Sequence, residues 1–183
     1  MTSVFIGGSR NISRLNPAIR ERLNNIIQKN FTVFIGDANG ADKAVQKYLA
    51  EKGYRNVIVF CMEGVSRNNL GQWDTRSVPA NSRRKDFRYY VRKDVEMAKE
   101  ASYGFMLWDG RSKGTLNNVL NLLRSGKTVL VYFSPEKKFC TLCRACELRQ
   151  LLEKCDRDVL EKLRKQVPVS ASFVSGQADL ELT

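Results

Sequence analysis

The sequence predicts an α/β fold: a doubly wound parallel sheet of about five to six strands with helices on both faces. Short apolar runs of strand length alternate along the chain with amphipathic stretches of helix length. The connections between them are short, which is typical of right-handed crossover units that build a parallel sheet. The 183 residues, 43% of them hydrophobic, suffice for one domain with a sizeable core.

The first strand is predicted at Ser3–Gly8, almost at the start of the sequence. The loop Gly7–Arg10 follows it, and two adjacent glycines permit a close approach of the backbone to a ligand or to a neighbouring element. A helix is predicted from Pro17 to about Lys29, because proline suits the first turn and apolar residues then recur at helical spacing.

The second strand, Thr32–Gly36, ends in the glycine-containing loop Gly36–Asp42, and a further helix begins there. In a purely structural interpretation, Asp42 is a favourable negative charge at the start of this helix. In a functional interpretation, Asp37 or Asp42 contacts a ribose hydroxyl or acts on the reacting bond. A third strand is predicted from about Asn56 to Met62. Neither the loop Gly7–Arg10 nor the loop Gly36–Asp42 fits G-x-G-x-x-G, so the usual dinucleotide fingerprint is absent.

Residues 63–82 form the longest stretch without clear periodicity, and loops of this length are often lids or binding loops. The segment Arg76–Lys93 is strongly basic and interleaved with aromatic residues, which favours phosphate binding with base stacking. A solvated helix face over core aromatics explains the same pattern. Residues 83–101 have helical spacing, and the basic lid would use the following residues: Arg76, Arg83, Arg84 and Arg88.

The stretch around which the chain is organised begins with the apolar run Tyr103–Trp108. Asp109–Lys113 forms a turn, and a helix opens at Gly114 and Thr115 and continues to Arg124. A strand, a glycine-containing loop and a helix start together form a geometry that holds phosphate, because free N–H groups and the positive helix end face the loop. An N-cap with a turn glycine is the plainer interpretation.

A fifth strand is predicted at Thr128–Phe133, and the tail that follows contains cysteines at helical spacing. The four tail cysteines, which could ligate zinc or simply be buried thiols, are Cys140, Cys143, Cys146 and Cys155. Two separate C-x-x-C pairs, of the form C-x-x-C…C-x-x-C, are not present, and we expect no metal. We expect residues 1–135 to form the nucleotide-binding domain and 136–183 a helical extension packed on it.

The balance of 31 Lys and Arg against 19 Asp and Glu gives a formal charge of +12, which favours anionic partners. The chain has no histidine, so a Ser-His-Asp triad and any histidine-containing metal site are excluded. We expect no membrane span and no signal peptide, and hence a reduced, cytoplasmic setting.

The three loop motifs together resemble the Rossmann-like superfamily called SLOG, which includes Smf/DprA DNA-processing proteins and "lonely guy" phosphoribohydrolases. The motifs are Val4–Arg10, Gly36–Lys43 and Trp108–Thr115, and the nearest branch is the small bacterial and phage proteins with a Gly-Ser-Arg start and a G-x-x-x-G-A-D loop. The resemblance covers about residues 3–135. It implies that the first and fourth strands are central and that ligands bind where their carboxyl ends meet.

The resemblance also implies a role for Gly114 and Thr115, which match the phosphate-holding Gly-Thr pair of the lonely-guy enzymes. Those enzymes use an Arg and a Glu, the Glu just after that pair, whereas this sequence has Leu116, Asn117 and Asn118 there. An oxocarbenium-like transition state needs a nearby carboxylate. The four aspartates that could supply one are Asp37, Asp42, Asp94 and Asp109.

The leading hypothesis is a sensor or sequestering protein that binds a nucleotide or nucleotide-derived molecule. The alternatives are a nucleoside 5′-phosphate N-glycosidase or ribosyl transferase, and a single-stranded nucleic-acid module using Arg76–Lys93. The expected ligand contacts are Gly7, Gly8, Ser9, Arg10, Gly36, Asp37, Gly40, Asp42, Trp108, Asp109, Gly110, Ser112, Lys113, Gly114 and Thr115. We expect no cofactor. The resemblance implies a homo-oligomer and a role in stress signalling or defence.

Overall fold

The computed structural model describes residues 1–79, 87–155 and 157–166, and it contains one seven-stranded sheet of order β4-β3-β2-β1-β5-β6-β7. The strands are β1 (Ser3–Gly8), β2 (Thr32–Ile35), β3 (Val57–Met62), β4 (Asp74–Val78), β5 (Tyr103–Trp108), β6 (Val129–Phe133) and β7 (Lys138–Leu142). All neighbours pair in parallel except β6 and β7. The α/β class with a mostly parallel, Rossmann-like sheet is therefore confirmed.

The winding of the sheet reverses between β1 and β5, which are far apart in sequence and adjacent in space. In β1, Ile6 pairs with Ile35 of β2 on one side and Phe105 of β5 on the other. The chain can leave β1 in only one direction, so the loops after β1 and β5 diverge and leave a crevice between them. This central pair is the one expected from the resemblance.

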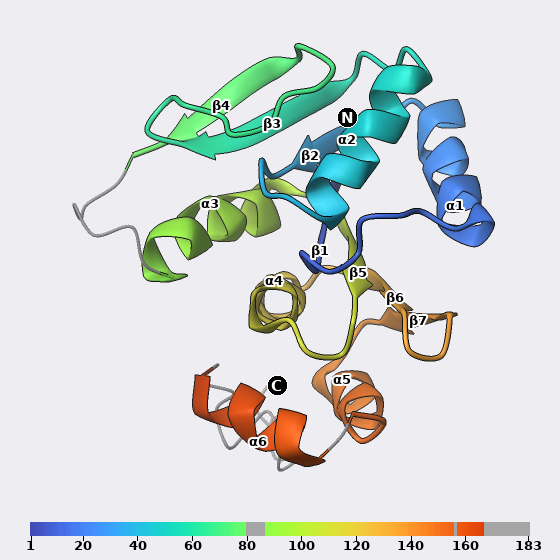
Figure 1. Ribbon diagram of the computed structural model, residues 1–183, viewed down its shortest axis with the longest axis vertical. Helices are drawn as coiled ribbons and strands as arrows, with labels where there is room; N and C mark the ends of the chain where they lie inside the picture. The colour runs from blue at the N-terminus through green and yellow to red at the C-terminus, as the bar shows by residue number, and fades with distance from the viewer. Residues whose placement is uncertain (80–86, 156, 167–183) are drawn as a thin grey trace, which may run out of the picture.

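Helices cover both faces of the sheet (Figure 1). Helices α1 (Pro17–Gln28) and α2 (Ala41–Glu51) pack on one face, where Ile19, Leu23 and Leu49 enter the same apolar cluster as Ile6 and Ile35. Helices α3 (Phe87–Glu100) and α4 (Lys113–Arg124) pack on the other face, together with α5 (Ala145–Leu152) and α6 (Arg157–Gln166). Two apolar layers therefore hold the sheet between them.

Side-chain caps fix where two of these helices begin. Asn16 caps α1 by accepting a hydrogen bond from the Ile19 N–H group at 2.9 Å, and Pro17 stands in the first turn. Ser112 caps α4 by accepting from the Thr115 N–H group. A cap satisfies a donor that the helix cannot use internally, so both start points follow from local sequence.

Two strands lie where the sequence analysis predicted none. β4 falls within the predicted loop 63–82 and pairs with β3 at the edge of the sheet, although its sequence, Asp-Thr-Arg-Ser-Val, is polar. β7 falls within the predicted helical extension and pairs antiparallel with β6. An edge strand is held by backbone hydrogen bonds to one neighbouring strand. Such pairing does not require an apolar run, so the sequence pattern does not reveal it. The division into two domains at residue 135 remains a prediction.

Candidate functional site

The loops after β1 and β5 are tied to each other at the switch point. The Ser9 side chain is fully buried, and its hydroxyl donates a hydrogen bond to Asp109 Oδ1 at 2.9 Å. The Ser9 N–H group donates to the Leu107 carbonyl, also at 2.9 Å. A β-carbon on Gly8 would collide with that carbonyl and would lie 2.8 Å from the Ala41 side chain. Glycine is therefore needed here for the close approach of β1, β5 and α2.

Asp109 shapes the second loop from inside. Its carboxylate accepts hydrogen bonds from the N–H groups of Arg111 and Ser112 at 3.0 and 2.8 Å, and from the side chains of Ser9 and Asn11. Burial by itself would raise the pKa of Asp109, but these hydrogen bonds favour the ionised form and lower the pKa below its ordinary value. Both carboxylate oxygens are thus engaged in holding the turn that leads into α4.

The first turn of α4 lines the crevice through Ser112, Gly114 and Thr115. Thr115 is buried, and its hydroxyl donates to Ser112 Oγ at 3.0 Å and lies 3.3 Å from Ser9 Oγ. No acidic residue stands in the first turn. A β-carbon on Gly114 would find no atom closer than Ser112 Oγ at 4.0 Å, so the space beside the helix start is open. This arrangement suits an anion.

A cluster of buried charges forms the opposite wall. The Lys93 ammonium is buried and lies 2.9 Å from Asp94 Oδ1 and 3.9 Å from Asp37 Oδ1. Burial alone would lower the pKa of Lys93, but the charges of Asp94 and Asp42 outweigh it and raise the pKa. Lys93 therefore remains a cation inside the protein.

Arg67 closes the outer side of this cluster. Its guanidinium donates to Asp37 through Nη2 at 2.7 Å and through Nε at 3.1 Å, and its backbone N–H group reaches the same carboxylate at 3.1 Å. Although burial acts to raise the pKa of Asp37, the hydrogen bonds from Arg67 and the charge of Lys93 lower it. Paired, bidentate contacts of this kind fix both side chains.

Asp42 differs from the other aspartates of the site. It is buried at the start of α2 and accepts a long hydrogen bond, 3.3 Å from the Ala38 N–H group. Burial raises its pKa to about 7, against the opposing charge of Lys93. A β-carbon on Gly36 would lie 2.5 Å from Asp42 Oδ2 and 2.8 Å from Lys93 Nζ, so glycine makes room for both groups. Near neutral pH the carboxyl group of Asp42 is present in both protonation states.

These walls enclose a cavity of about 120 Å³ at the carboxyl ends of β1 and β5, referred to below as the crevice. Polar and apolar side chains both line it. The lining residues are Phe5, Gly7, Gly8, Arg10, Ala38, Asp42, Arg67, Tyr90, Val91, Lys93, Asp94, Met97, Ser112, Gly114, Thr115 and Asn118. The amide of Asn118, with its nitrogen turned toward Asp94, lies 3.2 Å from Asp94 Oδ2.

The structure brings many of the predicted contacts together in the crevice. Two of the four candidate aspartates line it, Asp42 and Asp94. The predicted ligand residues that line it are Gly7, Gly8, Arg10, Asp42, Ser112, Gly114 and Thr115. Three sequence motifs therefore converge on one cavity.

Other predicted contacts lie beside the crevice or behind it. Ser9 and Asp109 hold the loops together, Asp37 lines a neighbouring cavity, and Trp108 is fully buried in the core. Gly110 has a positive φ of 75° and faces Phe133 and Pro135. The remaining predicted residues do not line the crevice: Gly36 and Gly40 stand in the loop before α2, and Lys113 is the first residue of α4.

The predicted basic lid is only partly described. Arg76 stands on β4, forms an ion pair with Glu100, and places its guanidinium 5.1 Å from the centre of the Phe60 ring. It does not line the crevice. Arg83 and Arg84 lie outside the described residues, as does the side chain of Arg88.

The sequence analysis missed two cations of the site. In the sequence, Lys93 is only the end of the basic segment Arg76–Lys93, and Arg67 falls in the stretch 63–82 that has no clear periodicity. For Lys93 a signal was present, since Tyr89, Lys93 and Met97 are four residues apart and all three are buried on one face of α3. Arg67 offers no such signal, because its loop is ordered by long-range hydrogen bonds, such as that from the Leu70 N–H group to Gln46 Oε1 at 3.1 Å.

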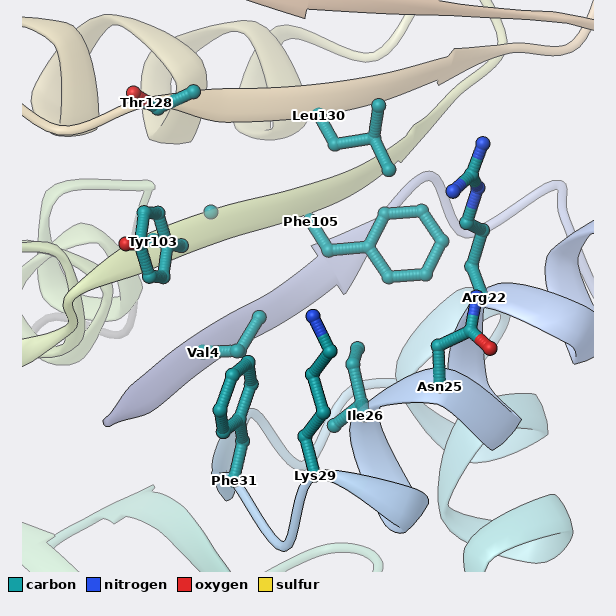
Figure 2. A pocket seen from close by; sticks show the side chains of 11 residues that line it. Val4, Arg22, Asn25, Ile26, Lys29, Phe31, Tyr103, Phe105, Thr128 and Leu130 are labelled. Carbon is teal, nitrogen blue, oxygen red and sulfur yellow. The ribbon is translucent and has the colours of Figure 1, made fainter. Parts of the chain in front are cut away.

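A second cavity, of about 280 Å³, lies at the opposite end of the sheet, where β1, β5 and β6 begin (Figure 2). Its walls are mostly apolar, with Val4, Phe105 and Leu130 on the strands. Two cations line it as well: Arg22 of α1 lies 5.2 Å from the centre of the Phe139 ring, and Lys29, the C-cap of α1, lies 5.8 Å from that of Phe31. Both are engaged by aromatic rings.

The five cysteines are free thiols, and within residues 1–79, 87–155 and 157–166 no cluster of His, Cys, Asp or Glu could hold a metal ion. Cys143 Sγ lies 3.6 Å from Thr128 Oγ1. Among the same residues, no helix has the length and apolar character needed to cross a membrane.

The fold and crevice place the chain in the class of Rossmann-like α/β proteins with a polar cavity at the switch point. No protein-family model matches the sequence, and no curated protein matches it either. A solved structure of DNA processing protein A from Helicobacter pylori, described for its single-stranded DNA binding mode, has a similar fold. The TM-score is 0.57 at 13% identity, over 90% of this chain and 81% of that chain. At this identity the similarity shows the fold alone.

Proposed function

We propose that the protein binds a phosphorylated nucleoside in the crevice, with the phosphate at the N-terminus of α4. One observation carries this: the open start of α4 faces a cavity that also holds the buried ammonium of Lys93. The helix start supplies N–H donors. Lys93 supplies a positive charge that solvent screens only weakly, because the group is buried. The carboxylates of Asp42 and Asp94 are acceptors for sugar hydroxyls in the same cavity.

The proposal is tested by placing a negative charge where the phosphate would lie. In Gly114→Asp the new carboxylate stands in the first turn of α4, where it favours the helix and repels a phosphate. Isothermal titration with nucleoside monophosphates and ribose 5-phosphate should show binding to the wild type and a loss of at least ~10-fold in affinity for this variant.

The matched control is Gly114→Asn, which has nearly the same shape without the charge. It should keep most of the affinity, and thermal unfolding should show both variants folded. Equal affinities for the aspartate and asparagine variants would contradict the phosphate site. Chromatography of each mixture also shows whether free base appears, which would indicate hydrolysis of the N-glycosidic bond and direct attention to Asp42 and Asp94.

The second candidate function is binding of single-stranded DNA. The similarity to DNA processing protein A favours it, as does the formal charge of +12. Fluorescence anisotropy with a labelled single-stranded oligonucleotide should then show affinity that falls steeply with salt. Absent binding at low salt, or binding that does not respond to salt, would exclude this candidate.

A further inference from the structure

The crevice adjoins a third cavity whose chemistry differs from its own. That cavity, of about 230 Å³, is called here the side cavity, and it shares Arg67 and Tyr90 with the crevice. Its lining residues are Asp37, Met62, Glu63, Val65, Arg67, Tyr89 and Tyr90. Small-molecule sites usually measure ~300–1,000 Å³. Neither cavity alone reaches that range, whereas their volumes together do.

The walls of the side cavity suit a flat aromatic group. Tyr89 and Tyr90 have ring centres 5.0 Å apart in an edge-to-face arrangement, and the Arg67 guanidinium lies 4.8 Å from the centre of the Tyr90 ring. Met62 adds an apolar, polarisable surface. Val65 lines the same cavity, and among the described residues 76% of its surface is exposed.

Glu63 supplies the polar group of this cavity from a strained position. It follows β3 with a φ of 53°, and Gly64 follows it with a φ of 80°. The turn is closed by the Val65 N–H group, which donates to the Met62 carbonyl at 3.3 Å. Two consecutive positive φ angles favour Asn or Gly at the first position, so a glutamate there is held at a cost in backbone energy.

The carboxylate of Glu63 retains hydrogen-bonding capacity. Its Oε2 accepts a hydrogen bond from the Tyr89 hydroxyl at 2.6 Å, and a carboxylate has room for further donors. The other acid of the cavity, Asp37, has both oxygens engaged by Arg67. Glu63 is therefore the carboxylate that can receive N–H groups from a ligand.

We propose that the side cavity binds the nucleobase of the ligand, and that the base is a purine with adjacent N–H donors, guanine foremost. The base would lie against Tyr90 and donate its ring N–H and amino N–H groups to Glu63. Its sugar would pass Arg67 into the crevice. This inference rests on the proposed function, because the phosphate at α4 sets the position of the sugar.

The experiment compares ligands that contain only part of a nucleotide. Isothermal titration of the full chain is carried out with GMP, AMP, CMP, ribose 5-phosphate and guanosine. GMP should bind at least ~10-fold more tightly than ribose 5-phosphate, as expected for hydrogen bonds to a charged group. AMP should bind less tightly than GMP, and CMP least tightly of the three nucleotides.

The informative variant is Glu63→Asn, because asparagine suits the backbone at this position and the fold is preserved or stabilised. It should lose the preference for GMP and keep its affinity for ribose 5-phosphate. Glu51→Gln is the matched control, since it removes a carboxylate from an exposed position of α2 and should leave all affinities unchanged.

Each outcome decides between the two proposals. Equal binding of GMP and ribose 5-phosphate, or an undiminished preference for GMP in Glu63→Asn, overturns the base site and leaves the phosphate site standing. Binding of guanosine that depends on Glu63, without binding of ribose 5-phosphate, supports the base site and overturns the phosphate site. If none of the five compounds binds, both proposals are wrong.

Discussion

The two ends of the sheet hold cavities of opposite character. At the carboxyl ends of β1 and β5, the crevice of about 120 Å³ is walled by buried charges such as Lys93 and Asp94. At the amino ends, the larger cavity of about 280 Å³ is walled by apolar strand residues, and its cations lie over aromatic rings. The apolar cavity is the larger of these two, whereas convergent polar groups and shifted pKa values select the crevice.

The same difference divides the energetics of the fold. At the amino ends, stability comes from apolar surface removed from water, which depends little on pH or salt. At the carboxyl ends, Lys93 and Arg67 compensate carboxylates that would otherwise be buried as unpaired charges. Changes at the crevice should therefore respond to pH, and changes at the apolar cavity should not. Three predictions test this contrast.

The largest effect is expected for Lys93→Met, which removes the cation between Asp37 and Asp94. Breaking a buried ion pair by removal of one partner costs ~3–5 kcal/mol, because the remaining charge stays buried. Denaturant unfolding should show that loss. In the control Lys47→Met, a lysine with 73% of its side chain exposed is removed, and the change should stay within ~0.5 kcal/mol. Equal losses of unfolding free energy for the two variants would show that the buried carboxylates do not depend on Lys93 for their stability.

The next effect is the pH dependence that Asp42 contributes. The folded protein raises its pKa from 3.8 to about 7, so the protonated form is favoured by folding. The contribution is complete below pH 3.8 and is lost as the pH rises through 7, with an amplitude on the order of 4 kcal/mol at most. The free energy of unfolding of Asp42→Asn, measured relative to the wild type from pH 4 to 8, should therefore increase with pH.

Asp37 and Asp109 provide the opposite sign in a separate window. Their pKa values are lowered, so their contribution is present above pH 3.8 and is lost as the pH falls below it.

A pH profile of Asp42→Asn that runs parallel to that of the wild type between pH 4 and 8 would contradict the raised pKa of Asp42.

The smallest effect is expected at the apolar cavity. Leu130 is only partly buried there, so Leu130→Ala should cost ~1–2 kcal/mol, less than a fully buried leucine. The loss, measured by denaturant unfolding, should be the same at pH 5 and pH 8, and nucleotide affinity should not change. A pH-dependent loss would mean that the two ends of the sheet are coupled.

The sequence predicted most of the elements that position the site. Five strands and a helix start near Gly114 were recoverable, because apolar periodicity and turn residues are local signals. The pairing of β1 with β5 at the switch point was implied only by the resemblance. The sequence did not predict β4 or β7, since their pairing depends on β3 and β6 more than on their own composition.

For the site, the sequence by itself determined the loops and their residue types: the glycines at 7, 8 and 114, the caps and the aspartates. Only the tertiary structure showed that Asp109 is an internal anchor, that Asp42 faces the crevice, and that Lys93 and Arg67 compensate the acids. Local sequence sets backbone conformation and amphipathic faces. Burial and charge pairing depend on residues far apart in the sequence, such as Ser9 and Asp109, which are 100 positions apart, and only folding brings them into contact.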